Sequence, residues 1–232
     1  MSQDTDTGLP QGEAKVKAVD DMFDAIAPRY DLLNRLLTFG MDVGWRRKAV
    51  RSLQLPHGAR VLDVACGTGD LCRELEKRGY RAIGVDRSSG MLAAQRTAAP
   101  LVRGDALRMP FRTNALDGIV CGFALRNFAS LKPFLVECGR VLRPGGRVAL
   151  LEVSEPENSV LRWGHSQYFG KVVPLVGGLL SDRDAYRYLP KSVAYLPPAN
   201  RMVAMLSESG FGSAARRPLS TGIAQLLTGT RR

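Results

Sequence analysis

Three aspartates near the ends of short apolar runs are the residues best suited to bind a polar ligand. Asp63, Asp86 and Asp105 occupy such positions in the first half of the chain. Short apolar runs are typical of buried parallel strands, and a carboxylate at a strand's carboxyl end can accept hydrogen bonds from two ribose hydroxyls. Such charge-assisted bonds contribute roughly 1.5–3 kcal/mol each. We therefore predict that Asp86 binds a ribose, because Ser88 or Ser89 can cap the following helix instead.

A glycine-rich turn follows the first apolar run. Gly67 and Gly69 tolerate backbone angles that other residues resist, so the chain can approach a ligand closely there. The helix predicted next, roughly Asp70 to Lys77, directs its free amide groups toward the same ligand. A dinucleotide fingerprint has a third glycine three residues after the second, where this chain has Cys72. The spacing therefore does not favour NAD.

The elements that must position these residues alternate between strands and helices. This alternation over 232 residues indicates one α/β domain with appended segments. Strands are expected at Val61–Val64, Tyr80–Asp86, Leu101–Asp105, Leu116–Ala124, Arg147–Val153, Ala214–Leu219 and Gly222–Thr230, and further helices at Leu131–Leu142 and Arg201–Ser209.

Three segments are additions to this alternating domain, which covers residues 53–232. Residues 1–13 are polar and are predicted to form a disordered tail. Residues 14–52 have apolar side chains at helical spacing, so we expect a helical segment on the substrate side of the site, broken near Pro28. Residues 156–198, inserted after the fifth strand, are expected to form a cap over the strand ends.

The order of these motifs resembles that of the class I S-adenosylmethionine-dependent methyltransferases, whose first motif joins an acidic strand residue to Gly-Thr-Gly. The resemblance implies a Rossmann-like, seven-stranded, mostly parallel sheet with an antiparallel last strand. It also implies S-adenosyl-L-methionine as the cofactor, with Asp63 near its amino group, Asp86 at the ribose and Asp105 at the adenine. The cofactor-binding residues that it implies are Asp63, Ala65, Gly67, Thr68, Gly69, Asp86, Arg87, Met91, Asp105, Ala106 and Gly122.

Other stretches resemble a narrower family, the C-methyltransferases of ubiquinone and menaquinone synthesis. They are Met22-Phe-Asp-Ala-Ile-Ala-Pro-Arg-Tyr-Asp31, Trp45-Arg46 and Phe123-Ala-Leu-Arg126-Asn127, within a resemblance that covers residues 19–230. The resemblance implies methylation of a ring carbon of a reduced prenylated quinone, with demethylmenaquinol as the leading substrate. The catalytic residues expected from it are Tyr30, Asp31, Arg126 and Asn127.

Three positions depart from this family's pattern. Ala124 replaces a glycine, Gly122 stands where many relatives have a serine that contacts the cofactor, and Gln225-Leu-Leu-Thr-Gly-Thr replaces the usual ending. These departures leave a second interpretation open, in which the substrate is another phenolic or secondary-metabolite compound. A third, a non-catalytic binding module, would not need the whole set of aspartates and glycines.

A methyl transfer to an aromatic carbon requires an electron-rich ring. A phenol with a pKa near ~10 is about three units from ionising at neutral pH, which corresponds to roughly 4 kcal/mol. We expect Arg126 to stabilise the phenolate and Asn127 to hydrogen-bond to the ring oxygen. Arginine stays protonated, so the proton acceptor is left open, with a water ordered by Arg126 and a carboxylate as one candidate.

The composition bounds the partners. A formal net charge of +11 implies attraction to an anionic partner. Acidic lipid is favoured over nucleic acid, because the chain has no run of five or six basic residues and its aromatic residues, 7% of the total, do not alternate with arginines. Cys66, Cys72, Cys121 and Cys138 form no CxxC pair, so neither a metal site nor a disulfide framework is expected.

A membrane contact is expected in the cap. The apolar stretch Val172–Leu180 is too short to cross a bilayer but long enough to enter its surface, and it is accompanied by Arg162, Lys171 and Arg183. The alternative is that this stretch packs on the sheet. The amino terminus does not resemble a signal peptide, so we expect a cytoplasmic protein that contacts the inner face of the membrane peripherally. A homodimer is compatible with the sequence.

Overall fold

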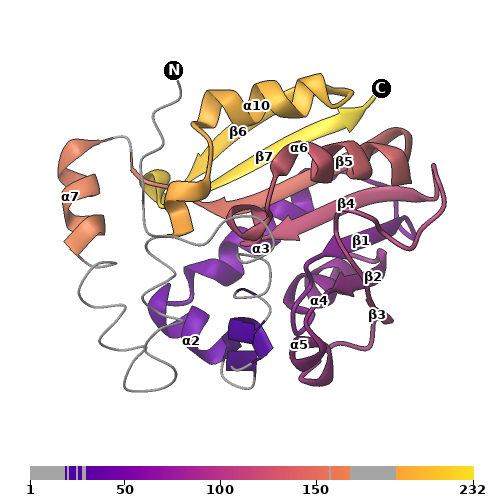
Figure 1. Cartoon of the computed structure of the whole chain (residues 1–232), viewed down its shortest axis with the longest axis horizontal. Coiled ribbons are helices and arrows are strands. Elements are labelled where there is room, and N and C mark those ends of the chain that lie inside the picture. The colour runs from indigo at the N-terminus through magenta and orange to yellow at the C-terminus, as the bar shows by residue number, and fades with distance from the viewer. Residues whose placement is uncertain (1–18, 20, 25, 28–29, 157, 168–191) are drawn as a thin grey trace.

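The computed structural model describes residues 19, 21–24, 26–27, 30–156, 158–167 and 192–232. Seven strands form one sheet in the order β3-β2-β1-β4-β5-β7-β6 (Figure 1). Only β7 runs antiparallel to its neighbours among these strands, as the sequence predicted. The strands are β1 (Arg60–Val64), β2 (Arg81–Asp86), β3 (Leu101–Arg103), β4 (Leu116–Gly122), β5 (Leu142–Val153), β6 (Phe211–Leu219) and β7 (Ala224–Arg231).

The strand order reverses between β1 and β4. From β1 the chain builds outward through β2 to β3, then returns to the other side of β1 to form β4 and β5. The connections that leave β1 and β4 therefore diverge, which opens a crevice at the carboxyl ends of these strands. In β1 every residue from Val61 to Val64 is buried, as expected for a central parallel strand.

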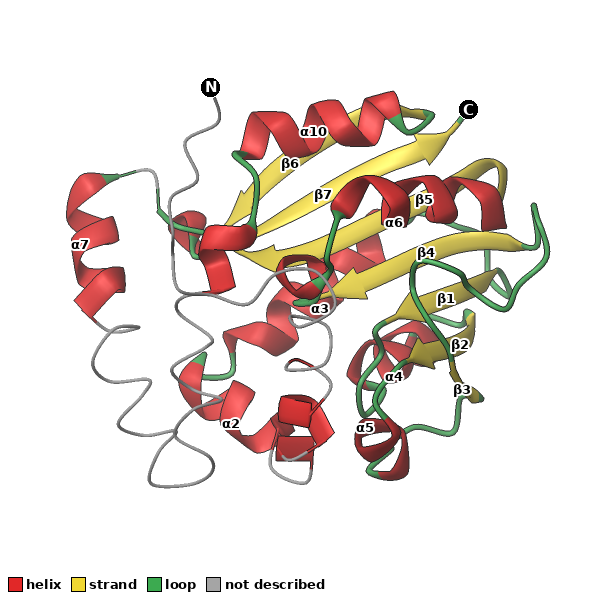
Figure 2. Ribbon diagram, in the orientation of Figure 1, coloured by secondary structure: helices red, strands yellow, loops and turns green. Residues whose placement is uncertain are grey.

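Helices cover both faces of the sheet (Figure 2). On one face, α3 and α4 pack through a cluster that includes Trp45, Val50 and Leu75. On the other face, α6 and α10 pack through a cluster that includes Phe134 and Leu206. The helices are α2 (Tyr30–Leu37), α3 (Met41–Ser52), α4 (Asp70–Lys77), α5 (Ser89–Ala93), α6 (Leu131–Val141), α7 (Ser159–Gln167) and α10 (Ala199–Glu208), with 3-10 turns η2 (Leu125–Asn127), η4 (Val193–Tyr195) and η5 (Ser220–Gly222).

Several predicted boundaries differ from the structure: β3 ends at Arg103 rather than Asp105, and β6 begins at Phe211 rather than Ala214. Two further differences have local reasons. β4 ends at Gly122 rather than Ala124, because Phe123 has a φ of 60° and turns the chain into η2. β5 begins at Leu142 rather than Arg147, because Leu142 already pairs with Leu116. The strand continues through the Arg143-Pro-Gly-Gly stretch with a register shift between Leu116 and Gly118 and a positive φ of 77° at Gly145.

The amino-terminal segment is attached to the sheet through α3. Trp45 is buried and its indole Nε1 donates a hydrogen bond to Ser220 Oγ at 2.8 Å, which connects α3 to the turn before β7. Val19 and residues 21–24 are helical, whereas the predicted break at Pro28 lies outside the described residues. The predicted tail and residues 168–191 of the predicted cap lie outside them as well.

Two further observations concern the described part of the chain. None of its helices combines the length and the apolar composition that a membrane crossing requires. The four cysteines are buried free thiols.

Candidate active site

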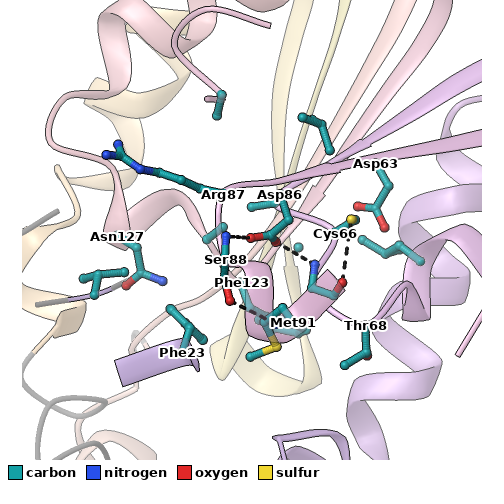
Figure 3. Close-up of a pocket in the computed structure, with 18 of the residues that line it drawn as sticks. Phe23, Asp63, Cys66, Thr68, Asp86, Arg87, Ser88, Met91, Phe123 and Asn127 are labelled. Atoms are coloured by element: carbon teal, nitrogen blue, oxygen red, sulfur yellow. Dashed lines mark hydrogen bonds between the residues drawn. The ribbon is translucent and has the colours of Figure 1, made fainter. Parts of the chain in front are cut away.

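A cleft of about 1100 Å³ opens at the carboxyl ends of β1, β2 and β4. Figure 3 shows the labelled part of its lining, which comes from the β1–α4 and β2–α5 loops, from the end of β4 and from the amino-terminal segment. Twelve of the residues predicted for the site lie in its wall: Asp31, Asp63, Ala65, Gly67, Thr68, Asp86, Arg87, Met91, Asp105, Ala106, Gly122 and Asn127.

Asp86 holds the two loops of the cofactor side together. Its Oδ2 accepts a hydrogen bond from the Gly67 backbone N–H at 2.7 Å, and its Oδ1 accepts one from the Ser88 N–H at 2.9 Å (Figure 3). Ser88 caps α5, because its Oγ accepts from the Met91 N–H at 3.0 Å. Asp86 thus lines the cleft and also fixes the conformation of the loop beneath it.

The glycine turn needs glycine at Gly69. Its φ is 91°, and a Cβ there would lie 2.4 Å from Thr97 Cγ2, so a larger residue would both strain the backbone and collide. Gly69 is the N-cap of α4 and is not among the residues of the described cleft lining. At Gly67 the space is open, since a Cβ would meet only Met91 Sδ at 3.9 Å. The backbone at Gly67 is thus directly exposed to a ligand.

Asp63 carries an unusual carboxylate at the base of the cleft. Its side chain is buried, and its Oδ2 accepts a long hydrogen bond from Cys72 Sγ at 3.5 Å. Among the described residues, its Oδ1 has no hydrogen-bond partner. Burial is the main cause that raises the pKa of this carboxyl to about 8. A cationic donor from a ligand would both satisfy Oδ1 and stabilise the ionised form.

The outer end of the cleft is more exposed. Arg87 Nη1 lies 3.6 Å from Asp105 Oδ2, and Asp105 Oδ1 accepts a hydrogen bond from the Leu107 N–H at 2.8 Å.

At Gly122, a Cβ would lie 2.8 Å from Leu71 Cδ1. The serine that many members of the resembled family have there would therefore require Leu71 to move, which gives a packing reason for glycine in this chain.

The amino-terminal segment supplies a second wall, whose main polar group is Asp31. This buried carboxylate accepts a hydrogen bond from Thr68 Oγ1, at 2.9 Å to each oxygen, and lies 3.7 Å from Arg96 Nε. Burial, and then the nearby charge of Asp70, raise the pKa of Asp31 above its ordinary value. Tyr30 is the first residue of α2, and its side chain lies outside the described part of the structure.

The sequence did not predict the roles of Arg46, Phe23 and Asp24. Arg46 lines the cleft, pairs with Asp42 and lies 3.6 Å from an Asp70 oxygen. Phe23 also lines the cleft, while Asp24 accepts hydrogen bonds from Ser88 Oγ and from the Gly90 N–H. The i,i+4 spacing of Asp42 and Arg46 could have indicated an ion pair, but not the cleft beside it.

Arg126 is not in the described lining of the cleft, although its neighbour Asn127 is. Its buried guanidinium pairs with Glu152, donates to the Phe123 carbonyl at 2.7 Å and donates to Ser192 Oγ at 3.1 Å. Glu152 and Ser192 are themselves fully buried. The structure therefore places Arg126 behind the cleft, with partners other than the substrate that the sequence-based hypothesis assigned to it.

The cleft has the features that S-adenosylmethionine requires. Asp63 offers an unsatisfied acceptor for an ammonium group, Gly67 offers open backbone, and Asp86 and Asp105 follow at the ends of successive strands. The chemistry of these residues fits the cofactor, and which part of it each residue binds stays a prediction.

Comparison with solved structures agrees with this fit. A SAM-dependent methyltransferase from Thermotoga maritima matches with a TM-score of 0.66 at 16% identity, covering 91% of this chain and 99% of that one. Phosphoethanolamine N-methyltransferase 2 of Haemonchus contortus, solved with S-adenosyl-L-methionine, matches with a TM-score of 0.59 at 13% identity, covering 80% of this chain and 52% of that one. These matches confirm the predicted fold.

Sequence comparison assigns the chain to a particular family. The model of the ubiE/COQ5 methyltransferase family matches residues 11–231, and the chain belongs to that family. It is 40% identical to a ubiquinone/menaquinone biosynthesis C-methyltransferase UbiE from Geobacter sulfurreducens, over 93% of this chain and 89% of the relative. It is 42% identical to a demethylmenaquinone methyltransferase from Deinococcus radiodurans, over 94% of both chains. The family predicted from the sequence is thereby confirmed, and with it the class of S-adenosylmethionine-dependent methyltransferases and the predicted cofactor.

Proposed function

We propose that this enzyme transfers a methyl group from S-adenosyl-L-methionine to a ring carbon of a reduced, prenylated demethylquinone, with demethylmenaquinol as its substrate. The single observation that carries the proposal is the identity of about 40% to relatives named for this reaction, which extends over both walls of the cleft. The lining supports it, because Phe23, Phe123 and Phe128 give the cleft aromatic surface suited to a flat ring.

Asp63, Gly67, Asp86 and Asp105 would hold the cofactor along the strand ends. When bound, the cofactor supplies a methyl group on a sulfonium that leaves readily, so the protein has to align the ring, exclude water and manage one proton. The amino-terminal segment would exclude water from the cleft. It contacts the core beside the cleft through Asp24 and Asp31, whose partners are Ser88, Gly90 and Thr68.

Asp31 is the proposed proton acceptor for the ring hydroxyl. It is buried, it lines the cleft, and its raised pKa makes it a stronger base than an ordinary aspartate. Asn127, which also lines the cleft (Figure 3), would hydrogen-bond to the ring oxygen. Tyr30, next to Asp31, is a further candidate for that hydrogen bond. Arg126 would act by positioning Asn127, its neighbour in η2, rather than by contacting the phenolate.

A prenylated quinol resides in the bilayer, so the enzyme is proposed to meet it as a peripheral protein at the inner face of the membrane. The predicted contact at Val172–Leu180 lies outside the described residues. The further proposal that the enzyme does not bind nucleic acid comes from the sequence alone, and the sequence is compatible with a homodimer without specifying one.

The test uses purified protein, S-adenosylmethionine and three acceptors: reduced demethylmenaquinone, a reduced demethylbenzoquinone and a soluble catechol. We expect methylation of the first, with a product that air reoxidises to a quinone, because a ring-methylated quinol keeps both hydroxyls whereas an O-methyl ether does not. Preference for the catechol, or a product that cannot be reoxidised, would contradict the proposal and favour the second, phenolic interpretation.

The role of Asp31 is tested with Asp31→Asn. We expect turnover to fall by about 100-fold, within the range for loss of a general base, while cofactor affinity changes little. The matched control is Asp24→Asn, which alters a carboxylate of the same segment that is not in the described cleft lining. Equal losses in both variants would assign Asp31 to closure of the segment instead of proton transfer.

A further inference from the structure

The outer face of α2 is apolar although it faces solvent. Leu32 is 64% exposed, Leu36 is 49% exposed and Phe39, just after the helix, is 77% exposed. The inner face of the same helix buries Asp31 and Leu37. A helix on the surface of a soluble domain normally has polar side chains outward, so this arrangement indicates a surface that has a partner. We call Leu32, Leu36, Phe39 and Met41 the α2 apolar patch.

A basic groove borders this patch. Its walls come from α2, α3 and α4 and contain five cationic side chains but only two carboxylates. Arg35, which is 50% exposed, belongs both to the groove and to the turn of α2 that carries Leu32 and Leu36. Arg47 and Lys77 are 55% and 64% exposed, and they share the single carboxylate of Glu74. The basic groove thus presents an excess of positive charge to solvent.

The basic groove is also next to the active site. Arg46 and Asp70 line both the groove and the catalytic cleft, and their ion pair is part of the wall between the two. Asp31 projects from α2 into the cleft, while Leu32 is exposed on its surface. A partner on the α2 apolar patch would therefore lie within one helix diameter, about 10 Å, of the cleft.

We infer that the α2 apolar patch and the basic groove together form the surface by which this protein docks on an anionic lipid bilayer. The inference rests on the proposed function, because a prenylated quinol must be taken from a bilayer. Exposed leucines and a phenylalanine enter the boundary between headgroups and acyl chains, and neighbouring cations bind acidic headgroups. Nucleic acid would not require the apolar side chains, and a second copy would bring two positive grooves together.

The test is cosedimentation with vesicles of neutral phosphatidylcholine, with and without phosphatidylglycerol. Wild-type protein should bind only the acidic vesicles and dissociate as salt rises, because screening reaches about 10 Å at 0.1 M. Leu36→Glu and the pair Arg47→Gln/Lys77→Gln should each weaken vesicle binding by at least about tenfold. Neither variant alters a residue of the described cleft lining.

Matched controls come from other surfaces. Val136→Glu on α6 introduces the same charge at a valine that is 53% exposed. Arg112→Gln/Arg201→Gln removes the same two charges at exposed positions. Both controls should bind acidic vesicles within about twofold of wild type. Equal weakening by the controls would overturn the inference, as would a change in oligomeric state in place of lost vesicle binding, which would make the patch an interface between copies.

Activity separates this inference from the proposed function. With a long-tailed quinol in vesicles, the two patch variants should lose activity in proportion to lost binding, while activity on a short-tailed soluble analogue stays unchanged. Normal vesicle binding by both patch variants overturns the docking surface but leaves the proposed reaction intact. If the wild-type protein methylates no quinol while the patch variants lose vesicle binding as predicted, the proposed reaction is overturned but the docking surface is supported.

Discussion

Arg46 and Arg126 are both almost completely buried and both contact Phe123, yet they belong to different parts of the molecule. Arg46 lies with its guanidinium carbon 5.2 Å from the centre of the Phe123 ring, on the side of the cleft. Arg126 donates to the Phe123 carbonyl and pairs with Glu152, away from the described cleft lining. One residue with a φ of 60° thus separates a cation at the active site from a cation in the core.

The difference shows why a motif does not define the role of each residue within it. Arg126 lies in the stretch expected to contact the substrate, but its guanidinium holds η2 and Ser192 against the sheet. Arg46 comes from a helix far away in the sequence and contributes a cation to the cleft wall, where it pairs with Asp70. In the structure Arg126 has the contacts of a positioning residue and Arg46 those of a site residue, and five measurements can break or sharpen this comparison.

The largest effect is expected from Glu152→Ala. It leaves the guanidinium of Arg126 buried without its counter-charge, which typically costs about 3–5 kcal/mol of unfolding free energy. Urea unfolding would measure the loss.

The control is the double variant Arg126→Met/Glu152→Leu, which removes both charges. Replacing a buried ion pair by apolar residues is often neutral, so stability should recover. Recovered stability and normal cofactor affinity without turnover would show that Arg126 serves the reaction and not stability alone, whereas recovered turnover would make the ion pair purely structural.

A second, somewhat smaller effect is expected for Asp86→Ala, on the cleft side of the comparison. Loss of the carboxylate removes the acceptor for ribose and releases the Gly67 and Ser88 amides. We expect cofactor affinity to fall by at least about 100-fold and unfolding free energy by only about 1–3 kcal/mol. Calorimetry with Asp105→Ala as the control should give a smaller loss, because Asp105 is about half exposed. A stability loss larger than the affinity loss would make Asp86 mainly structural.

The third measurement is the pH dependence of cofactor binding. The free carboxyl of Asp63 has a pKa of about 8, and a free α-amino group has one of about 7.7–8.0. In the complex, the ion pair of the Asp63 carboxylate and the cofactor's ammonium group holds one proton. When the two groups are apart, they hold two protons below pH ~8 and none above it. Affinity should therefore peak near pH 8 and fall up to about tenfold per unit on either side. Titration of Asp63→Asn should lack the decline on the acidic side.

The same raised pKa determines how stability varies with pH in the cofactor-free protein. Between pH ~4 and ~8 the native Asp63 retains a proton that the unfolded chain has lost. The unfolding free energy from this group should therefore decrease as pH rises through that range and level off above it. A constant difference between wild type and Asp63→Asn across the range would contradict the assignment.

The smallest effect is expected from Arg46→Gln on the pH profile of cofactor binding. The charge of Arg46 lowers the pKa of both Asp31 and Asp63, although burial outweighs it in each case. Its removal should raise both values further, so the acidic limb of cofactor binding should move to higher pH. Arg126→Gln is the matched comparison and should leave the limb in place; a shift in that variant would show that Arg126 also acts on the cleft.

Much of the fold and half of the site could be predicted from local sequence. The run Val61–Val64 followed by Gly67 and Gly69 predicts strand, turn and helix because buried strands need apolar residues and the turn needs positive φ. The bounds of α4 agree with the prediction for the same reason. The cofactor side of the cleft is built from these loops, so its aspartates lie where the strand ends place them.

The sequence by itself therefore determined the seven-stranded sheet, the cofactor loops and the family. Only the tertiary structure decided which arginine faces the cleft, that Asp31 meets Thr68, and that the apolar face of α2 is exposed. Local patterns specify backbone conformation, whereas the direction and burial of a side chain depend on elements distant in sequence. Arg126 illustrates this, because its charge is satisfied by Glu152 and Ser192, which lie 26 and 66 residues further along the chain.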